Sequence, residues 1–139
     1  MKKTILVLIT LITLTGCAEK MSGNYIKCTY SDKNDVMKQE KTYYIYPENE
    51  TITKIITKEK FKIYNKDINE KYDYVLSLKF EDFKEQNIDY KYKHNNNNYD
   101  IETTFELNNL DEETLNTYVG TKDLNEFKTN LIDSGYTCK

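Results

Sequence analysis

The chain has 139 residues, of which 38% are hydrophobic and 31% charged, and its formal net charge at pH 7 is −3. This length suits a single domain, and thirteen Tyr and five Phe supply more aromatic surface than a disordered chain would carry. All 20 basic residues are lysines, and the acidic balance with interspersed signs argues against a nucleic-acid partner and against a polybasic membrane patch.

The first residues have the pattern of a secretory signal peptide. Lys2 and Lys3 are followed by an uncharged apolar run from Thr4 to Leu14. That run is shorter than the about 20 residues that a permanent membrane-spanning helix needs. A small-residue exit site follows the run and ends at Cys17. The pattern therefore predicts export from the cytoplasm.

The exit site carries a more specific signal. Leu14-Thr15-Gly16-Cys17 resembles the lipobox of bacterial lipoproteins, which implies cleavage before Cys17 and a thioether lipid on that residue. An uncleaved anchor and a chance match are the alternatives. We expect a signal peptide at residues 1–16, the lipidated cysteine with a short tether at residues 17–24, and a single domain at residues 25–139. This organisation predicts a protein anchored by its lipid to the extracytoplasmic face of the cell membrane.

The other two cysteines, Cys28 and Cys138, lie at opposite ends of the expected domain. An even pair in an exported protein is most simply a disulfide, although two free thiols are the alternative. The bond would close a loop of about 110 residues, for which the chain-entropy treatment gives a stabilisation of about 4–5 kcal/mol.

Alternating apolar and polar residues predict three strands in the first half of the domain. They are Tyr25–Ser31, Val36–Tyr46 and Thr51–Tyr64. Pro47–Glu50 is expected to end the second strand. The apolar phase changes within the third, which predicts a bulge or a break near Thr57–Lys60.

A long helix is predicted next, with Asp67 and Glu70 as a capping box and an end near Gln86. Its expected buried stripe consists of Ile68, Tyr72, Val75, Leu76, Phe80 and Phe83. The alternative is a strand over Val75–Phe80.

A hairpin is predicted from Ile88 to Leu107, turning at Asn96-Asn97. In this register Lys93 faces Asp100, Lys91 faces Glu102 and Tyr92 faces Ile101, so that opposite charges pair on one face and apolar residues on the other. We expect that replacing Asn96-Asn97 by Asn-Gly preserves stability.

Two short helices are predicted at the end of the chain. The first has Asn109 and Glu112 at its start and ends at Gly120, and the second begins with Asp123 and Glu126 and ends at Gly135. Its expected buried residues are Leu124, Phe127, Leu131 and Ile132. The last four residues are expected to extend back to the first strand. The fold class predicted is α+β, with an antiparallel sheet of about five strands packed against one long and two short helices.

Together with the lipobox, this order of elements resembles the YehR-like family of small bacterial lipoproteins. The matching segments are Cys28-Thr29-Tyr30, Ile88-Asp89-Tyr90 through Leu107, and Leu131 through Lys139. The resemblance implies an α+β fold with an antiparallel sheet. The family has no assigned function, so the resemblance supplies no catalytic residues.

Few residues could carry catalysis. His94 is the single histidine and is expected to be an exposed turn residue near Asp100. Asp111-Glu112-Glu113 lacks the spaced oxygens and central glycine of a calcium loop, and acidic residues are favoured in a first helical turn by the helix dipole alone. We therefore expect no enzyme activity, no metal and no cofactor.

The tyrosines of the second strand are the candidate binding residues. Tyr43, Tyr44 and Tyr46 fall on both faces of that strand, so at least one of them must point away from the core. Exposed tyrosines can stack on a sugar or form a protein-binding patch, although single exposed aromatics are also common without a function.

The function expected is that of a lipid-anchored, non-catalytic binding or accessory module. The alternatives are a structural component of the cell envelope and, less favoured, an uncharacterised hydrolase. The expected partners are the membrane, through Cys17, and an envelope protein or glycan whose identity the sequence does not specify.

Overall fold

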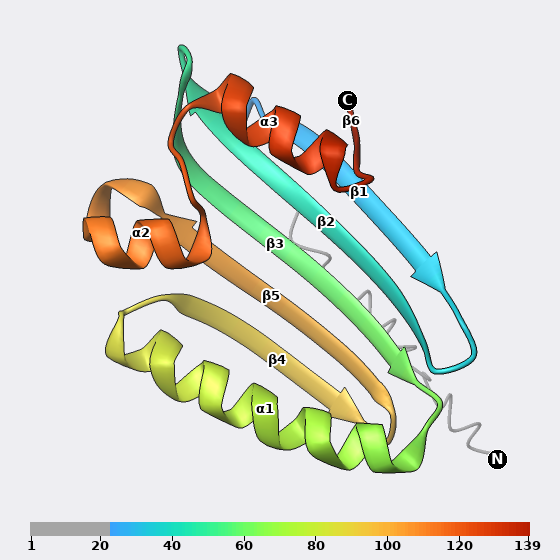
Figure 1. The fold of residues 1–139 in the computed structure, drawn as a ribbon. Helices are drawn as coiled ribbons and strands as arrows, with labels where there is room; N and C mark the ends of the chain where they lie inside the picture. The colour runs from blue at the N-terminus through green and yellow to red at the C-terminus, as the bar shows by residue number, and fades with distance from the viewer. Residues whose placement is uncertain (1–22) are drawn as a thin grey trace, which may run out of the picture.

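The computed structural model describes residues 23–139 (Figure 1). The predicted signal peptide, Cys17 and nearly all of the tether lie outside this range. The elements are β1 (Ile26–Lys33), β2 (Met37–Glu48), β3 (Thr51–Ile63), α1 (Lys66–Glu85), β4 (Asp89–Asn95), β5 (Asn98–Glu106), the 3₁₀ turn η1 (Leu107–Asn109), α2 (Glu112–Tyr118), α3 (Leu124–Asp133) and β6 (Thr137–Cys138). The six strands form one antiparallel sheet in the order β4-β5-β3-β2-β1-β6, which confirms the α+β class.

The three helices lie on one face of this sheet (Figure 1). Phe80 of α1 stacks on Tyr90, and Phe127 of α3 packs against Tyr43. Tyr90 and Tyr43 belong to one row of paired residues across the sheet, so they point to the same side. We call this side the helix face. The opposite side is the open face, because no helix of residues 23–139 covers it. Within the same range, no helix combines the length and apolar character needed to cross a bilayer.

The long helix α1 is confirmed, but its cap and its buried stripe differ from the prediction. Asn65, and not Asp67, is the N-cap, and its side chain accepts a hydrogen bond from the Ile68 amide. The residues that pack on the sheet are Tyr72, Leu76, Phe80 and Phe83. Ile68 and Val75 are exposed, Val75 because it lies about 100° around the helix from Leu76.

Two predictions about the β2–β3 region are wrong. Pro47 does not end the strand, because β2 continues to Glu48 and the chain turns at Asn49, whose φ is 59°. Nor is there a bulge near Thr57–Lys60, where β3 stays in register with both neighbours.

The register shift lies at the other end of this hairpin, between Tyr46 and Pro47. Thr53 is the additional residue in β3, and its hydroxyl donates to the carbonyl of Tyr46. The shift lets Ile52 and Ile55, three positions apart, both be buried. Pro47 has no amide hydrogen to donate, and it fits in β2 here because the hydrogen-bond ladder between β2 and β3 is already interrupted.

The hairpin of β4 and β5 is confirmed in detail. Lys93 lies opposite Asp100, Lys91 opposite Glu102 and Tyr92 opposite Ile101. The turn is more specific than predicted, because Asn96 alone has a positive φ, of 55°. Asn97 instead exchanges hydrogen bonds with the backbone of Ile63, which argues against the predicted tolerance of glycine at position 97.

The C-terminal helices are also confirmed, with corrected ends. Asp111, and not Asn109, caps α2, whereas Asp123 caps α3 as predicted. Ile132 is half exposed and does not belong to the buried stripe of α3. Gly120 and Gly135 both have a φ of 90°, which suits glycine after a helix.

The last strand joins the C-terminus to the first strand. Cys28 and Cys138 lie opposite each other in β1 and β6 and form a disulfide, which confirms the predicted pair. Lys27 and Lys139 exchange two backbone hydrogen bonds beside it. Because Cys28 is fully buried, the bond is part of the core.

Candidate functional site

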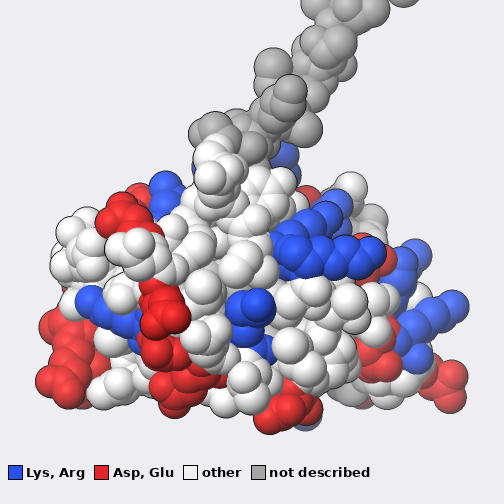
Figure 2. Space-filling view, turned by 90° about the horizontal axis from the view of Figure 1, so that it is seen from above, with Lys and Arg blue, Asp and Glu red and all other residues white. Residues whose placement is uncertain are grey.

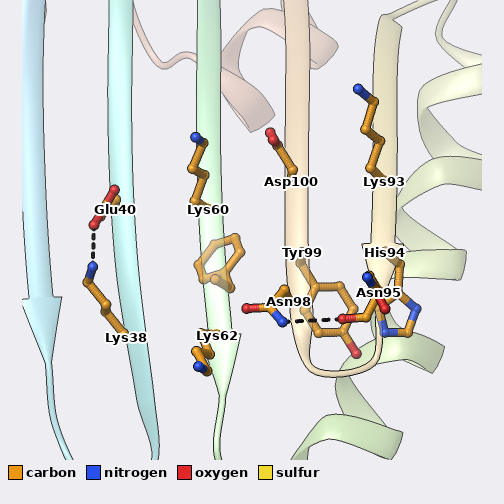
Figure 3. A pocket seen from close by; sticks show the side chains of 11 residues that line it. Lys38, Glu40, Lys60, Lys62, Lys93, His94, Asn95, Asn98, Tyr99 and Asp100 are labelled. Carbon is orange, nitrogen blue, oxygen red and sulfur yellow. Dashed lines mark hydrogen bonds and ion pairs between the residues drawn. The ribbon is translucent and has the colours of Figure 1, made fainter. Parts of the chain in front are cut away.

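The open face carries a lysine-lined depression near the β4–β5 turn (Figure 3). We call it the lysine hollow, and it encloses about 390 Å³. Its lining comes from β2, β3, β5 and β4 and includes Lys38, Lys60, Lys62, Lys93, Asn95 and Asn98, with the acidic residues Glu40 and Asp100. Phe61, His94 and Tyr99, which belong to the other phase of their strands, also border it. Strand alternation explains this arrangement, because the side chains of alternate residues on neighbouring strands point to the same side.

The ammonium groups of the hollow differ in how they are neutralised. Lys38 forms a 2.6 Å ion pair with Glu40, and this hydrogen bond raises the pKa of the lysine and lowers that of the carboxyl group. Lys60 and Lys93 flank Asp100 in the register, but neither forms an ion pair with any residue of the described chain. Lys93 and Asp100 are therefore cross-strand neighbours, as predicted, but they do not form an ion pair. Ammonium groups that line a hollow without a direct ion pair can bind an anion as point charges.

An ionic strip separates the lysine hollow from the other end of the open face. Glu102 lies between Lys58 and Lys91 at 3.0 and 3.2 Å, and Lys54 lies 2.9 Å from Glu106. Burial opposes ionisation of Glu102, but its hydrogen bonds with the two lysines outweigh burial and lower its pKa. These lysines are held in place on the sheet.

Beyond the ionic strip lies an aromatic group of Tyr25, Tyr44 and Tyr46, which we call the tyrosine cluster. The ring centroid of Tyr25 is 5.2 Å from that of Tyr44 and 5.7 Å from that of Tyr46. Lys27 and Lys58 each place Nζ 5.9 Å from the ring centroid of Tyr44, and Lys54 does the same at Tyr46. Burial raises the pKa of Tyr46 above its ordinary value.

The predicted set of Tyr43, Tyr44 and Tyr46 is therefore divided between the two faces. Tyr43 lies on the helix face, between Phe127 and Tyr136, and burial raises its pKa. Tyr44 and Tyr46 lie on the open face, in agreement with the prediction that at least one of the three tyrosines points away from the core. Sequence reasoning missed Tyr25, although its spacing from Lys27 assigns it to the same side of β1.

The helix face contains a second, smaller cavity of about 80 Å³ above the centre of the sheet. Thr57 and Thr103 face each other on its floor, and both hydroxyl groups are buried without a hydrogen-bond partner. Glu59 lies beside them, 3.2 Å from Lys41 and 3.8 Å from Lys79. A cavity of this size with two unpartnered hydroxyl groups suits ordered water.

The residues considered for catalysis have structural roles. His94 is stacked on Tyr99 and lies 3.5 Å from Asp73 of α1, not beside Asp100 as expected. Asp111 accepts a hydrogen bond from the Thr114 amide, and this bond lowers the pKa of its carboxyl group. Among residues 23–139, no three His, Cys, Asp or Glu side chains are grouped closely enough to hold a metal ion.

The sequence contained a signal for the lysine hollow that the prediction did not use. Lys58, Lys60 and Lys62 share one phase of β3, and the hairpin register places Lys91 and Lys93 on the same side. The net charge does not reveal this grouping, because it sums the charges of both faces of the sheet. In the view of Figure 2, lysine side chains form a block to the right of the centre, and acidic and basic side chains are interspersed around it.

Comparisons with known proteins bear on the fold alone. No protein-family model matches the sequence, and no curated protein matches it. A solved structure, the NMR structure of a protein from Streptococcus pneumoniae TIGR4, is similar with a TM-score of 0.54 and 14% sequence identity. The similarity covers 100% of this chain and 98% of that one. It shows that the arrangement of helices and strands recurs in another protein.

Proposed function

We propose that this protein is a lipid-anchored, extracytoplasmic and non-catalytic module that binds anionic groups through the open face of its sheet. The single observation that carries the proposal is the lysine hollow, where Lys60 and Lys93 have no ion-pair partner among residues 23–139. Ammonium groups that are held on a rigid sheet without a direct ion pair suit a ligand that carries phosphate or carboxylate groups.

The location in this proposal depends on Cys17 and is supported by the disulfide. The lipobox pattern predicts the anchor, and Cys17 lies outside the described residues. A buried disulfide between Cys28 and Cys138 suits an oxidising compartment outside the cytoplasm. We also propose that the chain belongs to the YehR-like lipoproteins, on the segments around Cys28 and from Leu131 to Lys139.

The anchor is tested in the expressing cell. Replacing Cys17→Ala should leave an unprocessed precursor without lipid, because the thioether forms on that sulfur. Membrane fractionation with mass spectrometry of the N-terminus measures this directly. Finding the variant cleaved before residue 17 and lipidated would rule the anchor out.

The binding site is tested with the full lipidated chain in zwitterionic detergent micelles, using inorganic triphosphate as the probe. The double variant Lys60→Gln and Lys93→Gln should bind triphosphate more weakly than the parent in calorimetric titration. The matched control replaces Lys66→Gln and Lys84→Gln on α1, which removes the same charge from the other side of the molecule. Equal loss in both double variants would show a net-charge effect and contradict a site in the lysine hollow. Unchanged binding in both would mean that the lysine hollow binds no anion, which leaves the structural-component alternative.

A further inference from the structure

We propose that the open face is a membrane-contact surface, with the tyrosine cluster at the level of the lipid headgroups and the lysines against anionic lipids of the same leaflet that holds the anchor. This inference rests on the proposed function, because it takes Cys17 as the lipidated residue. It names the partner of the open face, which is the surface of an anionic bilayer.

The position of the tether is the first argument. Gly23, the first described residue, lies against the tyrosine cluster, and a Cβ atom at this position would be 3.8 Å from the ring of Tyr46. Five residues lie between Cys17 and Gly23, and the six steps from one Cα atom to the next span roughly 20 Å at most when fully extended. A lipid on Cys17 therefore holds the tyrosine cluster within that distance of the bilayer, on whichever path the tether takes.

The chemistry of the tyrosine cluster is the second argument. A tyrosine ring has an apolar body and a polar hydroxyl group, which is the combination that is enriched at the interface between lipid and water. Three such rings lie together, and Lys27, Lys54 and Lys58 surround them. Lys54 and Lys58 are ion-paired with carboxylates of β5, whereas Lys27 forms no ion pair among residues 23–139. A long side chain such as that of Lys27 can lie along apolar surface while its ammonium group reaches the headgroups.

The distribution of charge is the third argument. The strand residues that point to the open face include nine lysines and six carboxylates, by the register of β1 to β5. The rest of residues 23–139 carries eight lysines and sixteen carboxylates. An anionic leaflet therefore attracts the open face and repels the helices, and both effects favour one orientation. The composition argued against a basic membrane patch because it gives only the total charge of the chain. It does not show that lysines are in excess on the open face and carboxylates elsewhere.

The outer side of α1 offers a competing surface. Tyr74, Val75 and Leu78 are exposed there and form an apolar patch. Beside the patch, the acidic residues Asp67 and Glu70 outnumber Lys71 and would face an anionic bilayer unfavourably. The described chain begins at Gly23, which lies against Tyr46 on the open face and not on this side. The two surfaces can be compared directly, because each contains a tyrosine that can be replaced.

The chain has no tryptophan, so one introduced tryptophan reports one surface. We would reconstitute the full lipidated Tyr44→Trp and Tyr74→Trp variants in vesicles of phosphatidylglycerol and phosphatidylcholine that include a lipid with a nitroxide on its headgroup. The Tyr44→Trp variant should lose most of its emission to the nitroxide and shift its emission maximum to shorter wavelength. The Tyr74→Trp variant should keep its emission. In pure phosphatidylcholine vesicles the difference should shrink, because the charge attraction is absent.

Several results would overturn the inference. Equal quenching of the two variants would mean that the domain rotates freely on its tether. Stronger quenching of the Tyr74→Trp variant would assign the contact to α1. A Tyr25→Trp variant repeats the measurement if Tyr44→Trp does not fold. Failure of the variants to float with the vesicles would overturn the proposed anchor itself. A protein that floats with the vesicles but whose Tyr44→Trp emission is not quenched would instead overturn only the membrane contact of the open face.

Discussion

Tyr43 and Tyr44 are neighbours in β2 that point to opposite faces of the sheet, one between Phe127 and Tyr136 and the other beside Tyr25. One residue is thus part of the packing under α3, and the next is part of the uncovered surface. This division separates packing under the helices from the proposed contact surface at two adjacent positions, and its effect on stability can be measured.

We expect Tyr43→Ala to lower the free energy of unfolding by about 3 kcal/mol, because it removes a large, partly buried side chain that packs against the core and leaves a cavity under α3. Tyr44→Ala should cost about 1 kcal/mol, since it loses mainly one aromatic pair on the open face. Urea unfolding of the two variants measures the difference. Equal losses would contradict the assignment of the two faces.

The disulfide between Cys28 and Cys138 should stabilise the domain strongly. It closes nearly the whole domain into one loop, with a sequence separation of 110 residues, and the chain-entropy treatment predicts about 4–5 kcal/mol for such a loop. Reduction should therefore lower the melting temperature of the wild-type protein. The variant with both Cys28→Ser and Cys138→Ser is the control, because a reductant should not change its melting temperature. An unchanged melting temperature of the reduced wild type would contradict this role.

The turn between β4 and β5 should respond differently to glycine at its two central positions. Asn96→Gly should preserve stability or raise it slightly, because Asn96 already has a positive φ. Asn97→Gly should lower stability by about 1 kcal/mol, since it removes the hydrogen bond of the Asn97 side chain to the Ile63 carbonyl. Thermal melting of the two single variants tests this order, and the reverse order would refute the described turn.

The domain should lose stability at alkaline pH. Burial and a hydrogen bond to Asp73 raise the pKa of Tyr92 to about 12, and burial also raises the pKa of Tyr43 and Tyr72. A tyrosine with a raised pKa contributes stability that is complete below its ordinary pKa of about 10 and is lost as pH rises through the folded value. The melting temperature should therefore fall between about pH 10 and pH 12.

The contribution of Tyr92 to this loss can be isolated. Tyr92→Phe removes its ionisable group, so the decline in melting temperature with pH should become shallower than in the wild type. Tyr74→Phe is the matched control, because Tyr74 is the most exposed of the large apolar side chains in the described chain. The same slope in the Tyr92 variant and the wild type would show that Tyr92 is not linked to folding.

How far the sequence predicted the fold depended on how local each signal was. The β4–β5 register was predictable because Lys91 and Glu102 on one face, and Tyr92 and Ile101 on the other, agree on a single alignment. The bulge at Thr53 was not predictable, because it depends on how β2 and β3 pair around Pro47. Helix caps were missed by two residues for a similar reason, since Asn65 and Asp67 are both good capping residues.

The candidate site was less predictable than the fold. Alternation shows that Tyr43 and Tyr44 point to opposite sides, but only the packing of the helices decides which side is covered. The lysine hollow draws on four strands, and its grouping requires the strand order as well as the register. Within one strand, a lysine such as Lys60 looks like any other solvated residue.

The most direct test of the account is lysine footprinting of the wild-type protein by an amine-reactive reagent and mass spectrometry. The lipidated chain is labelled in anionic vesicles and, for comparison, in zwitterionic micelles. We expect Lys60 and Lys93 of the open face to be modified more slowly in the anionic vesicles, whereas Lys66 and Lys84 of α1 keep their rates. Protection of the α1 lysines, or equal rates for both pairs in both settings, would contradict the claim that the open face binds the anionic surface.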